Sequence, residues 1–152
     1  MGIQDSKDVV RRLVTECVNS DRADLLDRYA APDVRVHPAT PGSAPDSEGI
    51  GELRAAFRGF HATFPDLHVD LDALIAEDDL VAARWTATGT HSAELAGVPA
   101  TGRAVRWSGT DVYRVTDGVV AEWWRNDDLT GLLAQLGARP ASGGGRPRTP
   151  AG

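Results

Sequence analysis

The sequence predicts an α+β domain, with helices in its first half and a curved antiparallel sheet in its second. Three observations carry this prediction. Before residue 65, apolar side chains recur every three or four residues, which is typical of amphipathic helices. After it they recur every second residue, which is typical of strands. The Asp117-Gly118 pair between two such alternating segments favours a tight hairpin turn.

The first helix is predicted over residues 5–19, where apolar residues follow the i, i+3, i+4, i+7 spacing. Asp5 or Ser6 is the expected N-cap, since both residue types accept hydrogen bonds from free backbone N–H groups. A short helix over residues 23–30 is expected to end before Pro32.

A brief strand over residues 34–37 and a Pro/Gly/Ser-rich loop over residues 38–47 come next. Residues 49–64 are predicted to form a second long helix, which Pro65 ends. One side of this helix is apolar and is expected to face inward: Ile50, Leu53, Ala56, Phe57, Phe60 and Phe64.

Four strands are predicted to complete the domain, over residues 67–77, 80–91, 103–116 and 119–127. In the first of them the expected inward residues are Leu67, Val69, Leu71, Ala73 and Ile75. A last short helix follows over residues 128–136, and the Asp127-Asp128 doublet is interpreted as turn and cap chemistry. The domain is expected to span residues 1–137, with a disordered Gly/Pro/Arg-rich tail over residues 138–152.

Charge and motif content exclude several classes of protein. A net charge of −6 and a pI near 5.1 argue against nucleic acid or an anionic membrane as partner. The chain has no apolar run of membrane-spanning length and no secretory signal, and the single Cys17 excludes a disulfide framework, so we expect a cytoplasmic protein. Neither clustered metal ligands nor a Gly-rich nucleotide loop occurs, so we expect no metal and no cofactor.

Two charged residues are expected on the inner face of the sheet. Asp111 and Arg125 occupy the alternate positions that otherwise carry mostly apolar and aromatic side chains. Because an unpaired buried charge is costly, they are expected to form either a structural salt bridge or a functional site. In a functional site, Arg125 would stabilise a developing oxyanion, and Asp111 would orient Arg125 or accept a proton.

The facing of this pair depends on the register of the last hairpin. A strict two-residue turn pairs Thr116 with Val119, and therefore Asp111 with Trp124. A bulge or a three-residue turn must shift the register by one residue to bring Asp111 opposite Arg125. Without that shift, Trp124 would point inward and Arg125 outward.

Aromatic side chains share the same inward face. They suit either an ordinary core or the flat wall of a cavity for a polycyclic aromatic ligand, and the small residues between them favour the cavity. The candidate wall consists of Trp85, Trp107, Tyr113 and Trp123 from the strands, with Phe57 and Phe64 from the helix.

Three histidines lie near this face or at its edge. His91 ends a strand on the inward positions, and it would either act as acid or base or anchor the following loop. His37 opens the Pro-rich loop and is a second candidate acid or base. His61 follows Phe60 on the long helix and would face either the cavity or solvent.

Two segments carry a family resemblance: residues 89–103 (GTHSAELAGVPATGR) and residues 111–137 (DVYRVTDGVVAEWWRNDDLTGLLAQLG). With the order of elements over residues 5–137, they resemble the SnoaL-like polyketide cyclases, in the superfamily named after nuclear transport factor 2. The resemblance implies a cone-shaped barrel with helices over the concave face of the sheet. It also implies an enzyme of anthracycline-type aromatic polyketide biosynthesis that holds a polycyclic substrate in the cone.

The chain departs from the aldol cyclases of this family at both charged positions. Those enzymes have a catalytic aspartate where this chain has Arg125, and a partner histidine where it has Asp111. Arginine stays protonated and cannot serve as that acid or base. The Asp/Arg pair instead resembles the hydroxylase-like branch, so two reactions stay open: ring closure, or hydroxylation that uses oxygen and a partner reductase. In either, Arg125 would stabilise an enolate or phenolate, and Asp111, His91 and His37 would transfer protons.

Two other functions and a homodimer are also considered. The superfold resemblance allows an epoxide hydrolase, but Arg125 occupies the position where that site needs an acid. A non-catalytic small-molecule-binding domain is the alternative from a different class. The outward Trp124 and the threonine-rich outer face predict a sheet-to-sheet homodimer.

Overall fold

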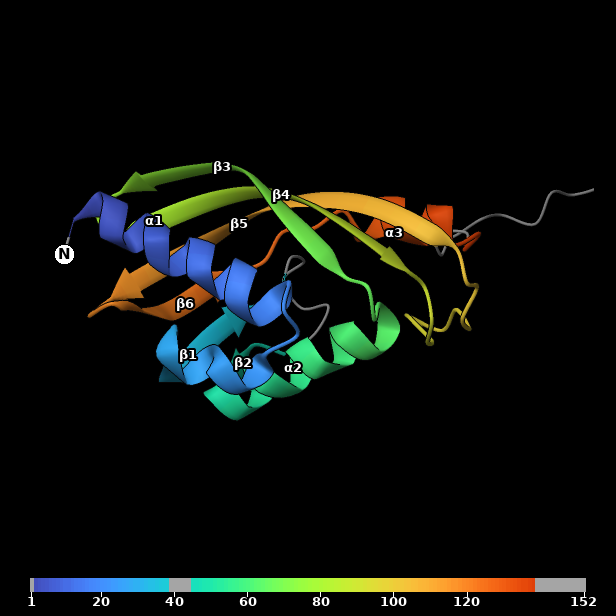
Figure 1. The fold of residues 1–152 in the computed structure, drawn as a ribbon, viewed down its shortest axis with the longest axis horizontal. Coiled ribbons are helices and arrows are strands. Elements are labelled where there is room, and N and C mark those ends of the chain that lie inside the picture. Colours follow the sequence, from blue (N-terminus) through green and yellow to red (C-terminus); the bar gives the residue numbers. More distant parts are fainter. Residues whose placement is uncertain (1, 39–44, 139–152) are drawn as a thin grey trace, which may run out of the picture.

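The computed structural model describes residues 2–38 and 45–138 and has the predicted α+β architecture (Figure 1). Six strands form one sheet in the order β2-β1-β6-β5-β4-β3. The strands are β1 (Ala30–His37), β2 (Ser47–Glu48), β3 (His68–Glu77), β4 (Leu80–Thr90), β5 (Ala104–Thr116) and β6 (Val119–Trp124). All neighbouring strands are antiparallel except β1 and β6, which pair in parallel. This pairing adds β1 and β2 to the edge of the predicted meander, although β1 and β6 lie far apart in the sequence.

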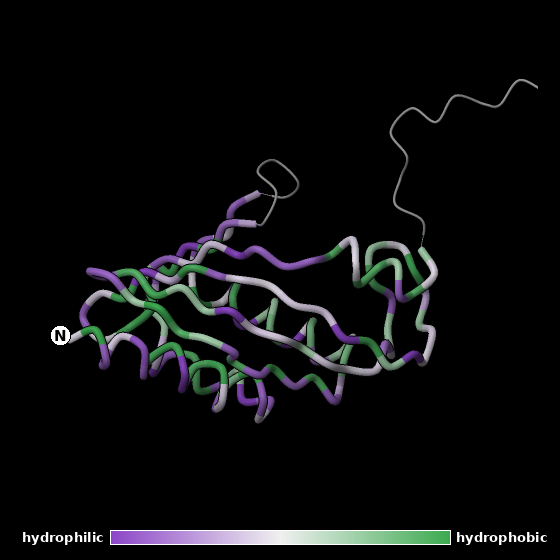
Figure 2. Tube along the Cα trace, turned by 90° about the horizontal axis from the view of Figure 1, so that it is seen from above, coloured by the Kyte–Doolittle hydropathy of each residue, from purple (hydrophilic) through white to green (hydrophobic). Residues whose placement is uncertain are grey.

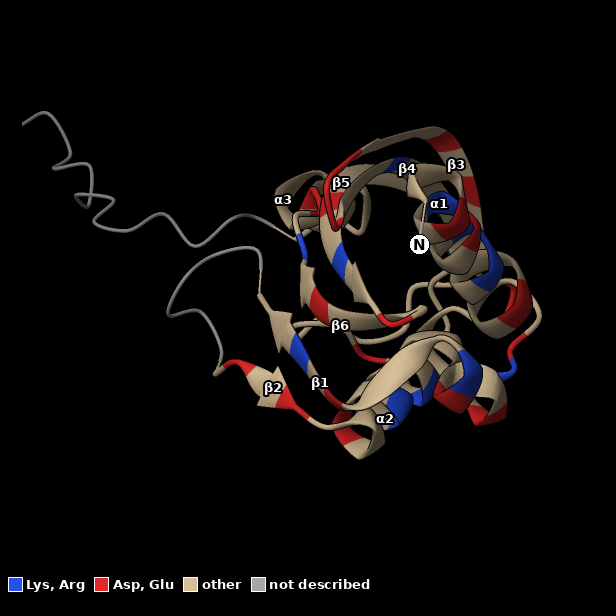
Figure 3. Cartoon of the chain, turned by 90° about the vertical axis from the view of Figure 1, so that its left-hand side faces the viewer, with Lys and Arg blue, Asp and Glu red and all other residues tan. Residues whose placement is uncertain are grey.

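Helices close the open side of the curved sheet. Helix α1 (Ile3–Arg12) continues into a π-helical turn (Leu13–Val18), and a short 3₁₀ helix (Ala23–Arg28) follows. Figure 3 shows the sheet curling from β3 round to β1, with α1 and α2 (Ile50–Thr63) across its open side. Helix α3 (Leu129–Gln135) packs against β5.

The first helix begins earlier than predicted. Gly2 is its N-cap, so the expected caps Asp5 and Ser6 lie inside the helix, and Ser6 is buried. Asp5 still supplies a cap interaction, because its carboxylate accepts a hydrogen bond from the Gly2 N–H at 3.1 Å. An acidic side chain in the first turn also interacts favourably with the helix dipole, which explains why the helix tolerates a glycine cap.

A bulge in β3 exchanges the inward and outward side chains in the second half of the strand. The pairing with β4 skips one residue between Leu71 and Ala73, so Asp72 is extra. Beyond that point Ile75 is 68% exposed, whereas Leu74 packs against the core. The prediction that Ala73 and Ile75 face inward is therefore wrong, since a one-residue slip moves every later side chain to the other face.

A second bulge, in β6, supplies the register shift that the inner-face prediction requires. Asp117 and Gly118 have φ values of 53° and 81°, as a two-residue type I′ turn demands. The pairing then shifts by one residue so that Ala121 is extra, and Tyr113 lies opposite Trp123. The turn keeps its preferred geometry, and the aromatic residues still share the inner face.

The apolar interior falls into two clusters. The larger lies between the N-terminal helices, α2 and strands β1 and β4–β6. The smaller surrounds Phe64 and Trp107 and includes Leu132 and Leu136 near α3. Hydrophilic and hydrophobic residues alternate along the chain rather than forming long apolar runs (Figure 2). No helix in the described ranges is long and apolar enough to cross a membrane. The predicted disordered tail, apart from Ala138, lies outside the described residues.

Gly109→Ala is expected to lower the free energy of unfolding by about 1–3 kcal/mol. A Cβ at this position would lie 2.5 Å from Cζ2 of Trp85 and 2.6 Å from the carbonyl oxygen of Asn126. Urea denaturation measures the loss. The matched control is Gly59→Ala on α2, where a Cβ meets nothing within 4 Å and should be neutral or stabilising by up to about 1 kcal/mol. Equal effects of the two substitutions would contradict the close packing of Trp85 on Gly109.

Candidate active site

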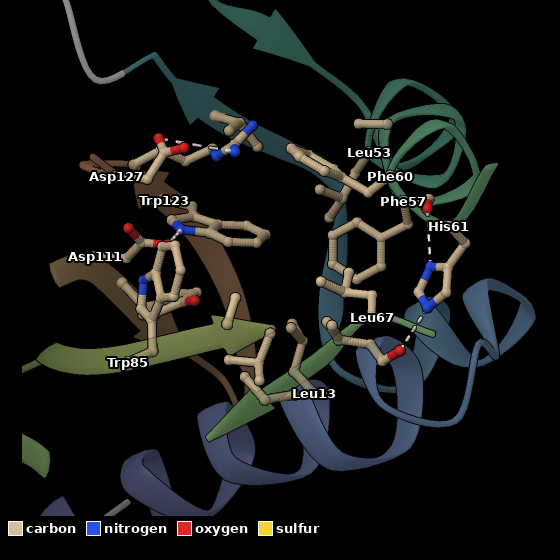
Figure 4. A pocket seen from close by; sticks show the side chains of 18 of the residues that line it. Leu13, Leu53, Phe57, Phe60, His61, Leu67, Trp85, Asp111, Trp123 and Asp127 are labelled. Carbon is tan, nitrogen blue, oxygen red and sulfur yellow. Dashed lines mark hydrogen bonds and ion pairs between the residues drawn. The ribbon is translucent and has the colours of Figure 1, made fainter. Parts of the chain in front are cut away.

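A cavity of about 160 Å³ lies between the inner face of the sheet, the π-helical turn (Leu13–Val18) and α2 (Figure 4). Its wall is mainly apolar, as in most small-molecule sites. The aromatic part of the wall consists of Trp85, Trp107, Tyr113 and Trp123 from the sheet and Phe57 and Phe60 from α2. Five of the six predicted wall residues therefore line the cavity.

Phe64, the sixth, lies elsewhere. It is fully buried in the smaller cluster, where its ring centroid is 4.8 Å from that of Trp107. The backbone of Gly89 approaches it so closely that a Cβ there would lie 2.9 Å from the Phe64 Cβ. Phe64 thus supports the cavity wall from behind and does not line the cavity.

Asp111 is almost completely buried, and both of its carboxylate oxygens accept hydrogen bonds. Oδ2 accepts from the indole N–H of Trp123 at 2.9 Å, and Oδ1 from the backbone N–H of Asn126 at 3.0 Å. Burial raises the pKa of Asp111 above its usual 3.8, and these two bonds oppose that effect. The indole N–H of Trp85 also acts to lower this pKa, although it makes no hydrogen bond of ordinary geometry with a described residue.

Arg125 follows β6 and lies at the edge of the cavity. Its guanidinium packs over the Phe60 ring, 4.9 Å from the centroid, and its Nη2 lies 4.0 Å from Oδ1 of Asp127. Within the described residues no ion pair joins Arg125 to Asp111, so the structural salt bridge, one of the two alternatives for this pair, is not formed. Arg125 also borders a second hollow on the outer side of the sheet, next to Trp124.

Asp127 is a cavity residue that the sequence analysis interpreted as turn chemistry. Only the second member of the doublet caps the helix, since Asp128 accepts a hydrogen bond from the Gly131 N–H at 2.9 Å. Asp127 instead pairs with Gly109 through a backbone bridge, and it is one of the residues that line the cavity. The sequence contained a signal for the inward position of Asp127, because it lies two residues after Arg125 and strand side chains alternate between the two faces.

His61 also lines the cavity; the sequence left open whether it faces the cavity or solvent. Its Nε2 lies 2.7 Å from the carbonyl oxygen of Val18, and its Nδ1 lies 3.1 Å from that of Phe57 (Figure 4). It therefore ties α2 to the end of the π-helical turn. Its position four residues after Phe57 places it on the inward face of the helix, which is the signal that could have identified it.

His91 lies outside the cavity lining. It is fully buried, and its Nδ1 accepts a hydrogen bond from the Thr101 N–H at 3.1 Å and lies 2.9 Å from the Thr101 hydroxyl. Its Nε2 meets no hydrogen-bond partner among the described residues. These contacts hold the loop between β4 and β5, which is the anchoring role that the sequence left open.

His37 lies on the outer side of the sheet, away from the cavity. Its Nε2 is 2.7 Å from Glu122, its Nδ1 is 2.9 Å from Asp46, and its ring stacks on Trp124. The hydrogen bond with Glu122, more than that with Asp46, raises the pKa of His37 above 6.5. The guanidinium of Arg114 also packs on Trp124, 5.6 Å from the ring centroid. Much of the surface of Trp124 is thus covered within its own chain, and the homodimer predicted from it stays a prediction.

No group of three or more His, Cys, Asp or Glu side chains that could hold a metal ion occurs in residues 2–38 and 45–138. Six polar or charged residues line the cavity. They are Ser47, His61, Tyr113, Asp111, Arg125 and Asp127.

A curved sheet with helices across its concave face is the nuclear transport factor 2-like fold, and the apolar cavity lies inside it. The profile of the SnoaL-like polyketide cyclases matches residues 8–136. The chain belongs to this family, which confirms the resemblance seen in its sequence.

Individual relatives agree with this assignment. DauD, an aklanonic acid methyl ester cyclase from Streptomyces sp. (strain C5), is 30% identical over 152 residues, covering 94% of this chain and 89% of its own. IdmH from Streptomyces antibioticus, a proposed polyketide cyclase, is 34% identical with a TM-score of 0.75, covering 88% of this chain and 99% of its own. AclR from Streptomyces galilaeus, a proposed hydroxylase, is 27% identical with a TM-score of 0.77, covering 91% and 100%.

Trp123→Phe is expected to lower the free energy of unfolding at pH 7 by about 1.5–3 kcal/mol more than Trp107→Phe. It removes a donor from the Asp111 carboxylate, whereas Trp107 donates to no carboxylate in the described part of the chain. The raised pKa of Asp111 means that the folded state favours the protonated carboxyl, which needs this donor less. The difference should therefore grow as the pH rises through the folded-state pKa, and shrink below it. Urea denaturation at several pH values measures it, and a difference that does not vary with pH would contradict the assignment.

His37→Gln is expected to flatten the decline of stability as the pH rises above 6.5. The raised pKa of His37 means that the folded state holds the proton more tightly than the unfolded state. Its contribution is complete below pH 6.5 and is lost as the pH rises through the folded-state pKa. Chemical denaturation across this range measures the slope. Glu122→Gln removes the main cause of the shift and should have a similar effect, while slopes equal to wild type would refute the coupling.

Proposed function

We propose that this protein is an enzyme of aromatic polyketide biosynthesis that catalyses an intramolecular aldol ring closure without a metal or an organic cofactor. Arg125 carries the proposal. Its guanidinium lies at the edge of an apolar cavity, and its ion pair with Asp127 is stretched to 4.0 Å. Donors in such a position can bind a developing oxyanion, and low polarity around them strengthens that interaction.

The cavity wall supports a flat aromatic substrate. Indole, phenol and phenyl rings face the space from both the sheet and α2, and planar rings stack well on such surfaces. Drug-sized ligands occupy cavities of roughly 300–1,000 Å³. A cavity of about 160 Å³ would therefore take the reacting ring, while the rest of a polycyclic substrate extends through the mouth. The name of DauD suggests aklanonic acid methyl ester as the first compound to try.

Ring closure requires one proton acceptor and one oxyanion site. The acceptor removes a proton from a carbon next to a carbonyl group, and the electron pair moves onto the enolate oxygen beside Arg125. The enolate carbon then attacks a second carbonyl carbon, a C–C bond forms, and the new alkoxide takes the proton back. The product is an isomer of the substrate, so no oxidant or reductant is consumed.

Hydroxylation is the second candidate, and the similarity to AclR favours it. The same Arg125 would stabilise the phenolate of a reduced aromatic substrate while oxygen reacts with the ring. This reaction needs molecular oxygen and a reductase that supplies the reduced substrate; one oxygen atom enters the ring and the other leaves as water. Its product is heavier than that of ring closure by one oxygen atom, which separates the two candidates in a mass spectrum.

Arg125→Ala is expected to lower kcat by about 10²–10³, the usual effect of removing an oxyanion donor. Incubation with aklanonic acid methyl ester, followed by mass spectrometry, measures turnover and product mass. Arg58→Ala, on the exposed side of α2, is the matched control and should leave turnover unchanged. A folded Arg125→Ala variant with full activity would rule out the mechanism, and a product gaining one oxygen would favour hydroxylation.

A further inference from the structure

The two carboxylates at the cavity differ in whether their oxygens are free. We propose that Asp127 is the carboxylate that accepts and returns the proton, and that Asp111 is a positioning residue that holds Asp127 and Arg125 in place. This inference deepens the proposed function and rests on it. It changes which residue carries the chemistry, since the sequence pointed to Asp111.

Asp111 is poorly placed to act as a base. A general base must come within about 2.6–3.2 Å of the proton it removes, directly or through one water. Only 4% of Asp111 is exposed, and each carboxylate oxygen already accepts a hydrogen bond, from Trp123 and from Asn126. Proton transfer to Asp111 would weaken both bonds and release the wall residue Trp123.

Asp127 has the access that Asp111 lacks. Asp127 is one of the residues that line the cavity, and 17% of its side chain is exposed. Its one polar side-chain contact within the described residues is the distant guanidinium of Arg125, at 4.0 Å. In Figure 4 Asp127 lies beside that guanidinium at one end of the cavity, opposite the aromatic rings of α2.

The backbone between the two charged residues explains the role of Asp111. Asn126 separates Arg125 from Asp127, and its N–H donates to Asp111 while its carbonyl oxygen accepts from the Thr110 N–H at 3.0 Å. The segment is therefore fixed to β5 on both sides. Residues 125 and 127 flank this anchored residue, so both side chains reach the cavity edge.

The proton balance of the ring closure then involves one side chain. Asp127 takes the proton from the substrate carbon, and Arg125 stabilises the enolate oxygen that forms. After the C–C bond has formed, protonated Asp127 returns the proton to the new alkoxide. The carboxylate is regenerated, and no other group changes its protonation or oxidation state.

The first test compares two isosteric variants with aklanonic acid methyl ester as substrate. Asp127→Asn should lower kcat by about 10²–10⁴ with little change in KM or thermal stability, and Asp127→Glu should restore part of the rate. Asp111→Asn should mainly lower the melting temperature, because its amide N–H₂ opposes one of the two donors. An Asp127→Asn variant within about threefold of wild-type kcat would overturn the proposal.

The second test does not depend on turnover and uses 4-nitrophenol, whose absorption spectrum distinguishes the phenolate from the phenol. Asp127→Asn should bind the phenolate about tenfold more tightly than wild type, because the anion no longer meets a carboxylate beside Arg125. Adding Arg125→Ala to this variant should abolish the gain. If wild type fails to convert the ester but the phenolate gain is seen, the proposed substrate fails and the assignment of Asp127 stands. An unchanged phenolate affinity in Asp127→Asn would refute that assignment.

Discussion

The buried carboxylate of Asp111 is the constraint on which the charged end of the cavity depends. A carboxylate withdrawn from water is tolerated only when its oxygens are hydrogen-bonded. Here the two donors come from β6 and from the second residue after it, so satisfying Asp111 also fixes the ring of Trp123 and the backbone of Asn126. The positions of Arg125 and Asp127 follow, because each is covalently linked to Asn126. The hydrogen bonds to Asp111 thus fix one ring of the aromatic wall and the backbone between Arg125 and Asp127.

That interaction is possible because of a single extra residue in β6. Asp117 and Gly118 favour a two-residue turn, and continuous pairing from such a turn would place Asp111 opposite Trp124. The bulge at Ala121 corrects the register without altering the turn. The preferred two-residue turn and the inward facing of the apolar side chains are therefore compatible only because the strand contains a bulge.

Much of this arrangement was predictable from period-two alternation, and the failures have local causes. Alternation placed Asp111 and the strand aromatics inward, and the need to bring Asp111 opposite Arg125 predicted the shift in β6. The bulge at Asp72 escaped prediction because apolar residues keep alternating through it, so both registers bury a similar pattern. The parallel pairing of β1 with β6 joins residues far apart in sequence and leaves no local signal. His91 lies on the alternate positions of its strand that face inward. Alternation alone does not say which part of the interior an inward side chain enters.

Arg125 borders both the inner cavity and the hollow on the outer side of the sheet. The residue that would bind the oxyanion is therefore shared by two faces of the sheet. A substitution at Arg125 changes the lining of both spaces at once, so its effect on one face cannot be separated from its effect on the other.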